Sequence, residues 1–169
     1  MTAKESRTLR PATREDSKAI LNLAVASGLF QEDETAVLAE MLADAFAGHL
    51  EDHHWIVLED GPGKGEPGGG AMVAAACVAP EMMSDRTWNL YFIAVAAPHQ
   101  GRGLGAALLT HVEETLRKGG ARLLLIETSG LDSFAATRRF YRTRGYEEEA
   151  RIRDFYRAGE DKIVFRKLL

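Results

Sequence analysis

The residues best suited to chemistry in this chain lie in one glycine-rich segment, Gln100-Gly-Arg-Gly-Leu-Gly-Ala106. Glycines at positions 101, 103 and 105 leave no side chain that would keep a ligand away from the backbone. A helix that begins here would present unpaired amide N–H groups and the positive end of its dipole, with Arg102 beside them. Helix starts of this kind bind phosphate and pyrophosphate groups. The segment therefore predicts a phosphate-binding cradle.

The sequence on either side places this cradle between a strand and a helix. Trp88 to Val95 is apolar and aromatic on both faces, as a central strand should be. Downstream, an apolar residue recurs at every fourth position, which marks one buried face of a helix: Leu104, Leu108, Val112 and Leu116.

Two motifs fit the segment. Gly101-x-Gly103-x-x-Ala106 matches a dinucleotide fingerprint, with Glu127 placed 21 residues beyond Ala106 as the ribose-binding acid. That fingerprint requires glycines directly after the strand and several further strand–helix units. Here 96–100 intervene, and 63 residues follow Ala106, too few for such a series.

The other reading takes Gln100-x-x-Gly103-x-Gly105 as the unit, with Val95 and Pro98 before it and Ala107-Leu-Leu after it. This pattern closely resembles the acetyl-coenzyme-A signature of the GNAT acetyltransferase superfamily. We favour this interpretation over the dinucleotide fingerprint.

The remaining chain alternates helices and strands without an internal repeat. The predicted order is strand, two helices, three strands, helix, strand, helix and two strands, over Thr8–Pro11, 13–27, 34–48, Trp55–Leu58, Ala71–Val78, Thr87–Val95, Leu104 onward, Arg122–Thr128, 132–144, Tyr146–Phe155 and Lys162–Leu168. This order resembles the GNAT fold over residues 7–169, taken as one domain with 1–6 as an N-terminal tail. The resemblance implies an α/β fold: a single central mixed, largely antiparallel sheet of about seven strands, flanked by about four helices and splayed between strands four and five.

Local patterns add detail to the first two helices. Thr13 and Asp16 form a candidate capping box at the start of the first helix. In the second helix we expect five apolar side chains on the buried side: Val37, Leu38, Met41, Leu42 and Phe46.

The resemblance also implies how acetyl-coenzyme A binds, with its pantetheine arm between the splayed strands. Main-chain groups around Ile93 and Val95 would hydrogen-bond to the pantetheine amides. The cradle would hold the pyrophosphate through Gln100, Gly101, Arg102, Gly103, Leu104, Gly105 and Ala106. An amine would then attack the thioester directly, while a backbone N–H near the strand end stabilises the oxyanion.

The resemblance implies Tyr141 as the general acid. Phe140-Tyr-Arg-Thr-Arg-Gly-Tyr146 resembles a late motif of the family, aliphatic-Tyr-x-x-x-Gly-aromatic, that carries this tyrosine. A phenol with a pKa near 10 protonates a departing thiolate and stays protonated itself at pH 7. The alternative is a core tyrosine beside Phe140. Where many members carry Asn, seven residues earlier, this chain has Phe134.

Glu127 is the candidate general base, because an attacking ammonium with a pKa near 10.4 must first lose a proton. It ends the fifth predicted strand, close to where some family members place a carboxylate. The alternative role is a solvated residue, or one in a salt bridge with Arg138 or Arg142.

Composition narrows the function further. The formal charge of −4 and the pI near 5.8 argue against a nucleic-acid or membrane-surface binder. The single cysteine, Cys77, fits a reducing compartment, and the polar Met1–Arg10 carries no secretory signal, so we expect a cytoplasmic protein. The spacing of His49, His53 and His54 fits no helical metal site, and no metal is expected.

The resemblance implies an N-acetyltransferase that moves an acetyl group from acetyl-coenzyme A to a primary amine in a ternary complex, and the composition agrees with such an enzyme. The acceptor would be a small-molecule amine or a peptide amine. The sequence is compatible with a monomer or a homodimer. The alternatives are a regulatory GNAT domain that binds coenzyme A without turnover and, third, a nicotinamide-dependent oxidoreductase.

Overall fold

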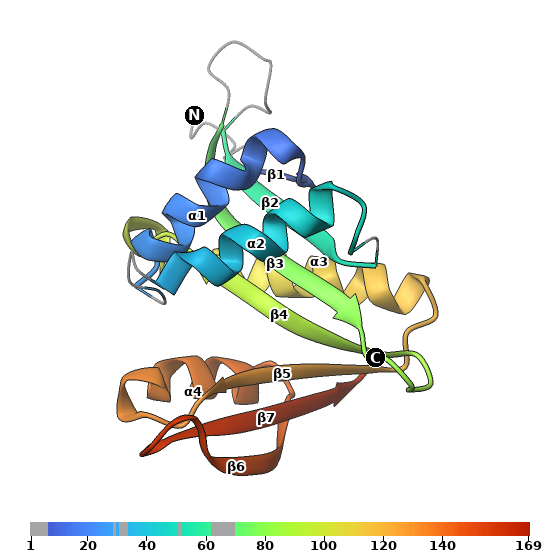
Figure 1. Cartoon of the computed structure of the whole chain (residues 1–169), viewed down its shortest axis with the longest axis vertical. Helices are drawn as coiled ribbons and strands as arrows, with labels where there is room; N and C mark the ends of the chain where they lie inside the picture. The colour runs from blue at the N-terminus through green and yellow to red at the C-terminus, as the bar shows by residue number, and fades with distance from the viewer. Residues whose placement is uncertain (1–6, 29, 31–33, 51, 62–69) are drawn as a thin grey trace, which may run out of the picture. The chain divides into compact units, whose positions relative to one another are not determined.

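The structure is a computed structural model that describes residues 7–169 except 29, 31–33, 51 and 62–69. The predicted N-terminal tail, 1–6, lies outside the described residues. Within them the chain forms seven strands and four α-helices in the predicted order (Figure 1): β1 Arg7–Pro11, α1 Ser17–Ala26, α2 Thr35–Phe46, β2 His54–Asp60, β3 Ala71–Pro80, β4 Thr87–Val95, α3 Leu104–Lys118, β5 Leu123–Ser129, α4 Ala135–Thr143, β6 Glu147–Arg157 and β7 Glu160–Leu168.

The strands form one mixed sheet in the order β1-β2-β3-β4-β5-β7-β6. The pairs β1–β2, β2–β3, β5–β7 and β6–β7 are antiparallel, whereas β4 and β5 are parallel. The parallel pairing runs from Thr87 with Leu123 to Leu90 with Ile126. Both strands continue beyond it, β4 to Val95 and β5 to Ser129. The predicted mixed, largely antiparallel sheet is confirmed.

The chain divides into two compact units. The first comprises Met1–Val78 and Phe92–Val112, and the second comprises Ala79–Tyr91 and Glu113–Leu169. Strands β3 and β4 and helix α3 each contribute residues to both units.

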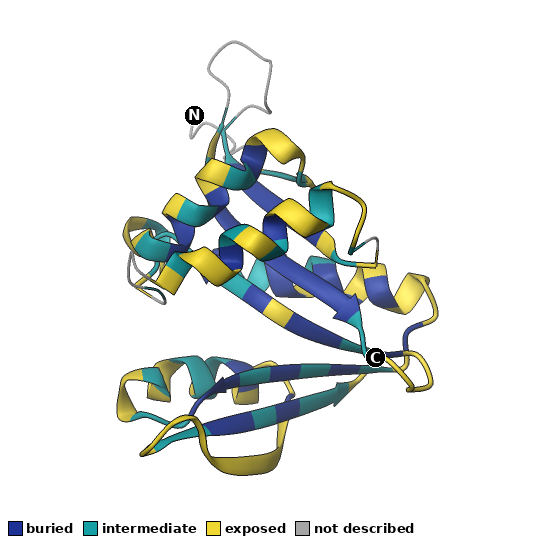
Figure 2. Ribbon diagram, viewed as in Figure 1, coloured by how far each residue is buried: buried dark blue, intermediate teal, exposed yellow. Residues whose placement is uncertain are grey.

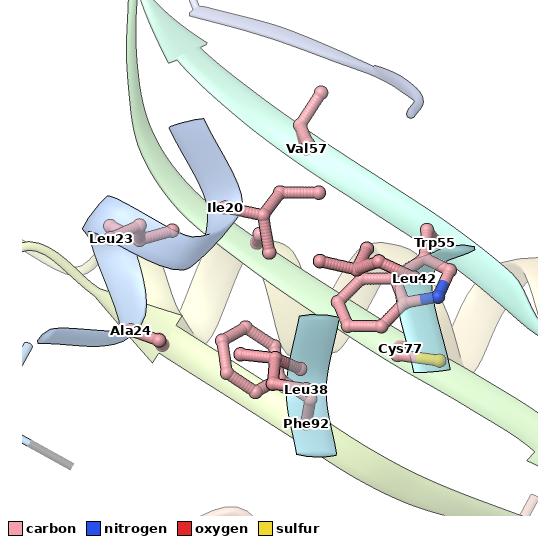
Figure 3. Close-up of a cluster of buried hydrophobic side chains, with 11 residues drawn as sticks. Ile20, Leu23, Ala24, Leu38, Leu42, Trp55, Val57, Cys77 and Phe92 are labelled. Atoms are coloured by element: carbon pink, nitrogen blue, oxygen red, sulfur yellow. The ribbon is translucent and has the colours of Figure 1, made fainter. Parts of the chain in front are cut away.

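The core of the first unit lies between helices α1 and α2 and one face of strands β2, β3 and β4 (Figure 3). Trp55 and Phe92 form its aromatic centre, with ring centroids 5.5 Å apart. Alternate residues of β2 and β3, such as Ile56 and Ala76, are also buried, so both faces of these two strands are covered. The apolar stripe predicted on α3 is confirmed, since its four residues are all buried.

The predicted buried face of α2 is wrong at one position. Leu38 and Leu42 are buried, and Met41 and Phe46 pack against the core, but the side chain of Val37 is 75% exposed. At about 100° of rotation per residue, Val37 and Phe46 lie at opposite edges of the apolar stripe. The longer Phe46 side chain reaches the core from that edge, and the short Val37 side chain does not.

The predicted capping box helps to hold the start of α1. The Thr13 backbone N–H donates to Asp16 Oδ2 at 2.7 Å. Arg10 also donates to both Asp16 (2.7 Å) and Glu59 (2.6 Å), which ties β1 to β2 and to the helix start. The two carboxylates raise the pKa of Arg10, with the hydrogen bond to Asp16 as the main cause.

The core of the second unit is aromatic and centred on Phe165 of β7, which is fully buried. The Tyr146 hydroxyl donates to Glu113 Oε1, and Lys167 Nζ donates to Glu113 Oε2, both at 2.8 Å. Strand β6 is exposed along its whole length, as Figure 2 shows, whereas β5 and β7 carry buried residues.

Candidate functional site

The cradle lies in the first unit, in the turn that joins β4 to α3. A short 3-10 turn over Ala97–His99 occupies the gap between strand and glycines. Gly101 and Gly103 then adopt φ angles of +74° and +79°, a left-handed conformation that side chains disfavour. These two angles explain why the turn needs glycine at both positions.

The end of the cradle is the N-terminus of helix α3. The Ala107 N–H donates to Gly103 O at 3.0 Å, which is the first turn of helical hydrogen bonding. The N–H groups of Leu104, Gly105 and Ala106 precede that bond and therefore have no intrahelical acceptor. A Cβ atom built at Gly101 or Gly103 would meet no atom within 4 Å, so the space over the turn is open. Open backbone, orphan amides and the helix dipole together fit a phosphate-bearing ligand.

Gln100 shapes the cradle through its side chain. Its Nε2 donates to Val95 O at 2.9 Å and to Ser27 O at 3.2 Å, which joins the turn to the end of β4 and to the end of α1. The side-chain nitrogen is thus used by the protein backbone. A direct contact of Gln100 with a cofactor stays a prediction.

Arg102 lies within a polar group that the sequence did not indicate. Its Nη1 is 3.3 Å from His99 Nδ1 and 4.0 Å from Asp60 Oδ2. Asp60 ends strand β2, so the acidic residue beside the cradle comes from a strand distant in the sequence. Part of the positive charge of Arg102 is therefore already balanced within the protein.

Ile93 and Val95 lie at the end of β4, in the same unit as the cradle. The Ala96 N–H donates to Val73 O at 2.9 Å, which anchors the strand end to β3. The role predicted for Ile93 and Val95, binding of pantetheine amides, stays a prediction.

The second unit contains Glu127 and Tyr141, the two residues expected to transfer protons. Glu127 Oε2 lies 2.7 Å from Lys162 Nζ. In the antiparallel β5–β7 register, Ser129 pairs with Lys162 and Glu127 pairs with Val164, so Glu127 and Lys162 are diagonal neighbours on one face.

Glu127 therefore forms a salt bridge, as in its alternative role, but the candidate partners Arg138 and Arg142 were wrong. Arg138 instead donates to the carbonyl oxygens of Ser129 and Leu131, both at 2.7 Å, and stabilises the loop before α4. Arg142 forms an ion pair with Glu148 of β6. The sequence could not indicate Lys162, because β7 lies beside β5 only through the strand order.

Tyr141 is the inward-pointing member of the two adjacent aromatic residues. It is 3% exposed, and its ring lies 5.4 to 5.9 Å from those of Phe140, Tyr146 and Phe165. Burial raises the pKa of Tyr141 above its ordinary value, so the phenol is protonated at neutral pH. None of the residues that the structure describes hydrogen-bonds to its hydroxyl. The packing suits a core tyrosine, and its role as an acid stays a prediction.

Three polar residues beside Glu127 were missed at the sequence level. Glu81 Oε1 accepts hydrogen bonds from Asn89 Nδ2 at 2.8 Å and from the Tyr91 hydroxyl at 3.2 Å. Asn89 Nδ2 also lies 3.5 Å from Glu127 Oε1. Burial, followed by the charge of Glu81, raises the pKa of Tyr91. In the sequence, the feature that could have indicated this polar cluster is Asn89, a side-chain amide within a mostly apolar strand.

Two further features bear on the class of site. Over the described ranges, no three histidine, cysteine or carboxylate side chains are grouped as metal ligands would be. Among the helices that the structure describes, none is long and apolar enough to cross a membrane.

Known structures share this fold over nearly the whole chain. A protein from Desulfovibrio desulfuricans assigned to the GNAT family of acetyltransferases is 33% identical, with a TM-score of 0.84 over 96% of this chain and 99% of that one. The ribosomal-protein-S18-alanine N-acetyltransferase of Escherichia coli is 24% identical, with a TM-score of 0.71 over 96% and 94% of the two chains. A Salmonella typhimurium protein with bound acetyl-CoA is 21% identical, with a TM-score of 0.73 over the same shares. The last two show the fold alone.

No curated protein sequence matches the chain. Residues 18–146, by contrast, match the model of the acetyltransferase (GNAT) family. With a glycine cradle at the start of α3 and a parallel β4–β5 pair, the chain belongs to the GNAT family and is an acetyl-coenzyme-A-dependent acetyltransferase.

Proposed function

We propose that this acetyltransferase moves the acetyl group to a primary amine by direct attack in a ternary complex, within one domain over 7–169. The observation that carries the proposal is the open cradle at the start of α3. Gly101 and Gly103 have left-handed backbones there, and the amides of 104–106 precede the helical hydrogen bonds. The acceptor is a small-molecule amine or a peptide amine.

Several groups of the first unit would hold the cosubstrate. The amides of 104–106 and the Arg102 guanidinium are donors for phosphate oxygens. Main-chain groups of Ile93 and Val95 suit the amides of an extended pantetheine arm. When bound, acetyl-coenzyme A supplies an acetyl group activated as a thioester.

Glu127 and Tyr141 have complementary roles in proton transfer. Glu127 accepts the proton of the amine, and the ion pair with Lys162 holds its carboxylate in place. Tyr141 donates a proton to the departing thiolate. Support for this role comes from its hydroxyl, which donates to no described residue and carries its proton at neutral pH.

A buried and unpaired Cys77 suits a reducing compartment, and we place the protein in the cytoplasm.

The alternative function is a regulatory domain that binds coenzyme A without turnover. Such a domain would use the same cradle, but Glu127 and Tyr141 would have no role in proton transfer. Turnover therefore separates the two.

The test incubates the protein with acetyl-coenzyme A and a panel of amines: amino acids, peptides with free N-termini, polyamines and aminoglycosides. Mass spectrometry detects acetylated products, and a thiol reagent detects released coenzyme A. We expect at least one amine to gain an acetyl group with equimolar thiol release. Tight coenzyme A binding without acetylation of any amine would support the regulatory alternative.

A further inference from the structure

We propose that Glu81 and Asn89 bind the acceptor as a protonated alkylammonium or α-ammonium group, an inference that rests on the proposed N-acetyltransfer. The ammonium site comprises Glu81, Asn89, Tyr91 and Glu127. Glu81 directly follows β3, Asn89 and Tyr91 alternate on β4, and Glu127 lies on β5. All four belong to the second unit.

The first argument is a buried acceptor without a donor. Asn89 is 2% exposed, and its Nδ2 faces both carboxylates, at 2.8 Å from Glu81 Oε1 and 3.5 Å from Glu127 Oε1. Its Oδ1 is buried and has no hydrogen-bond partner. Buried carbonyl oxygens are nearly always paired, because an unpaired one is destabilising. Asn89 Oδ1 therefore lacks an N–H or O–H donor, which a ligand in this cluster would supply.

The second argument is an uncompensated charge. Glu127 forms an ion pair with Lys162, whose Nζ also lies 3.5 Å from the centroid of the Phe155 ring. Glu81, in contrast, forms no ion pair with any residue that the structure describes. Its Oε1 accepts from two neutral donors, which leaves Oε2 available. Glu81, Glu127 and Lys162 together have a net charge of −1, which a single cation would balance.

These two features select the chemical class of the ligand. A primary ammonium has three donors and no acceptor, so one group can donate to both Glu81 and Asn89 Oδ1. Alkylamines and peptide N-termini, with pKa values of about 10.4 and 8, are largely cationic at neutral pH. Aromatic amines are neutral there and would not balance the charge. Tyr91 is 47% exposed, so solvent reaches the cluster at this residue.

The kinetic test uses Glu81→Gln, which removes the charge and keeps the shape of the side chain. A charged hydrogen bond of ordinary strength corresponds to about a 10- to 100-fold change in affinity. We therefore expect KM for the alkylammonium acceptor to rise by that factor, with KM for acetyl-coenzyme A unchanged. Glu114→Gln, which changes an exposed carboxylate on α3, is the matched control and should leave both constants unchanged.

A binding measurement makes the test independent of turnover. Propylammonium is titrated into the intact protein with coenzyme A present, while NMR follows the side-chain amide resonances of Asn89. We expect a saturable shift that 1-propanol does not cause, with a midpoint at least tenfold higher in Glu81→Gln than in Glu114→Gln. No shift at Asn89, or an equal midpoint in both variants, would overturn the ammonium site.

The two proposals fail differently. If propylammonium shifts Asn89 through Glu81 but no amine is acetylated, the ammonium site stands and the proposed function fails. If amines are acetylated while Glu81→Gln changes neither the midpoint nor the amine KM, the function stands and the ammonium site fails.

Discussion

At the scale of single residues, the two side chains proposed for proton transfer, Glu127 and Tyr141, lie in different environments within the second unit. Glu127 has a cationic partner in Lys162, whereas Tyr141 lies among aromatic rings with a raised pKa. A carboxylate can accept a proton, and a protonated phenol can donate one. The two side chains therefore suit opposite steps of one reaction.

Replacing Tyr141 by Phe tests the proposed acid. The substitution keeps the ring and its packing, and removes a hydroxyl that no described residue hydrogen-bonds. We expect the free energy of unfolding to change little. We expect kcat to fall by about 10²-fold, because a general acid typically contributes at least that factor to the rate. Steady-state kinetics and thermal unfolding measure the two effects.

Tyr146→Phe is the matched control, because it removes a neighbouring hydroxyl that donates to buried Glu113. This variant should lose about 1–3 kcal/mol of stability, as expected when a buried hydrogen bond to a charged group is broken. Its kcat should stay close to wild type. Equal kcat in Tyr141→Phe and the wild type, with chemistry rate-limiting, would exclude Tyr141 from proton transfer.

At the scale of elements, the turn from β4 into α3 combines two different uses of glycine. Gly103 has a left-handed backbone, which the fold itself requires. Gly105 lies inside α3, where the backbone accepts any residue and alanine is favoured over glycine. A ligand close to the backbone would give Gly105 a reason to lack a side chain.

Gly105→Ala should therefore change stability and binding in opposite directions. Alanine should raise the free energy of unfolding by about 0.5–1 kcal/mol. Its methyl group should weaken acetyl-coenzyme A binding, because it stands between the phosphate and the helix amides. Chemical denaturation and calorimetry measure the two quantities, and Ala107→Gly, one turn into the helix, is the control that lowers stability alone. Unchanged affinity in Gly105→Ala would place the phosphate elsewhere.

At the scale of the whole molecule, local signals were read correctly from the sequence and non-local ones were not. The glycine turn between β4 and α3 and the α3 stripe follow from neighbouring residues, and the structure contains both, whereas phosphate binding by the turn stays a prediction. Lys162 pairs with Glu127 only because β7 lies beside β5, and Glu81 contacts Asn89 across the turn between β3 and β4. A strand order cannot be derived from periodicity, so the contact of Lys162 with Glu127 was missed. Val37 is an exception among the local signals, because its exposure depends on how far a short side chain reaches from the edge of the α2 stripe.

Stability in alkali should also reflect the buried thiol. Burial raises the pKa of Cys77 to about 12, whereas an unfolded thiol titrates near 8.5. Between these values the unfolded state loses a proton that the folded state keeps, so stability falls as pH rises, by up to about 1.4 kcal/mol per pH unit from this group. Denaturation from pH 8 to 11 should show a shallower decline in Cys77→Ala than in the wild type. Parallel curves would mean that the thiol titrates normally in the fold.

The central claim is that the turn between β4 and α3 holds acetyl-coenzyme A. Calorimetric titration of the intact protein with acetyl-coenzyme A and with NAD tests it most directly, with Gly103→Val as the variant and circular dichroism to confirm its fold. We predict one binding site for acetyl-coenzyme A, no heat from NAD, and loss of binding in the folded variant. Binding of NAD alone, or wild-type affinity for acetyl-coenzyme A in folded Gly103→Val, would contradict the account.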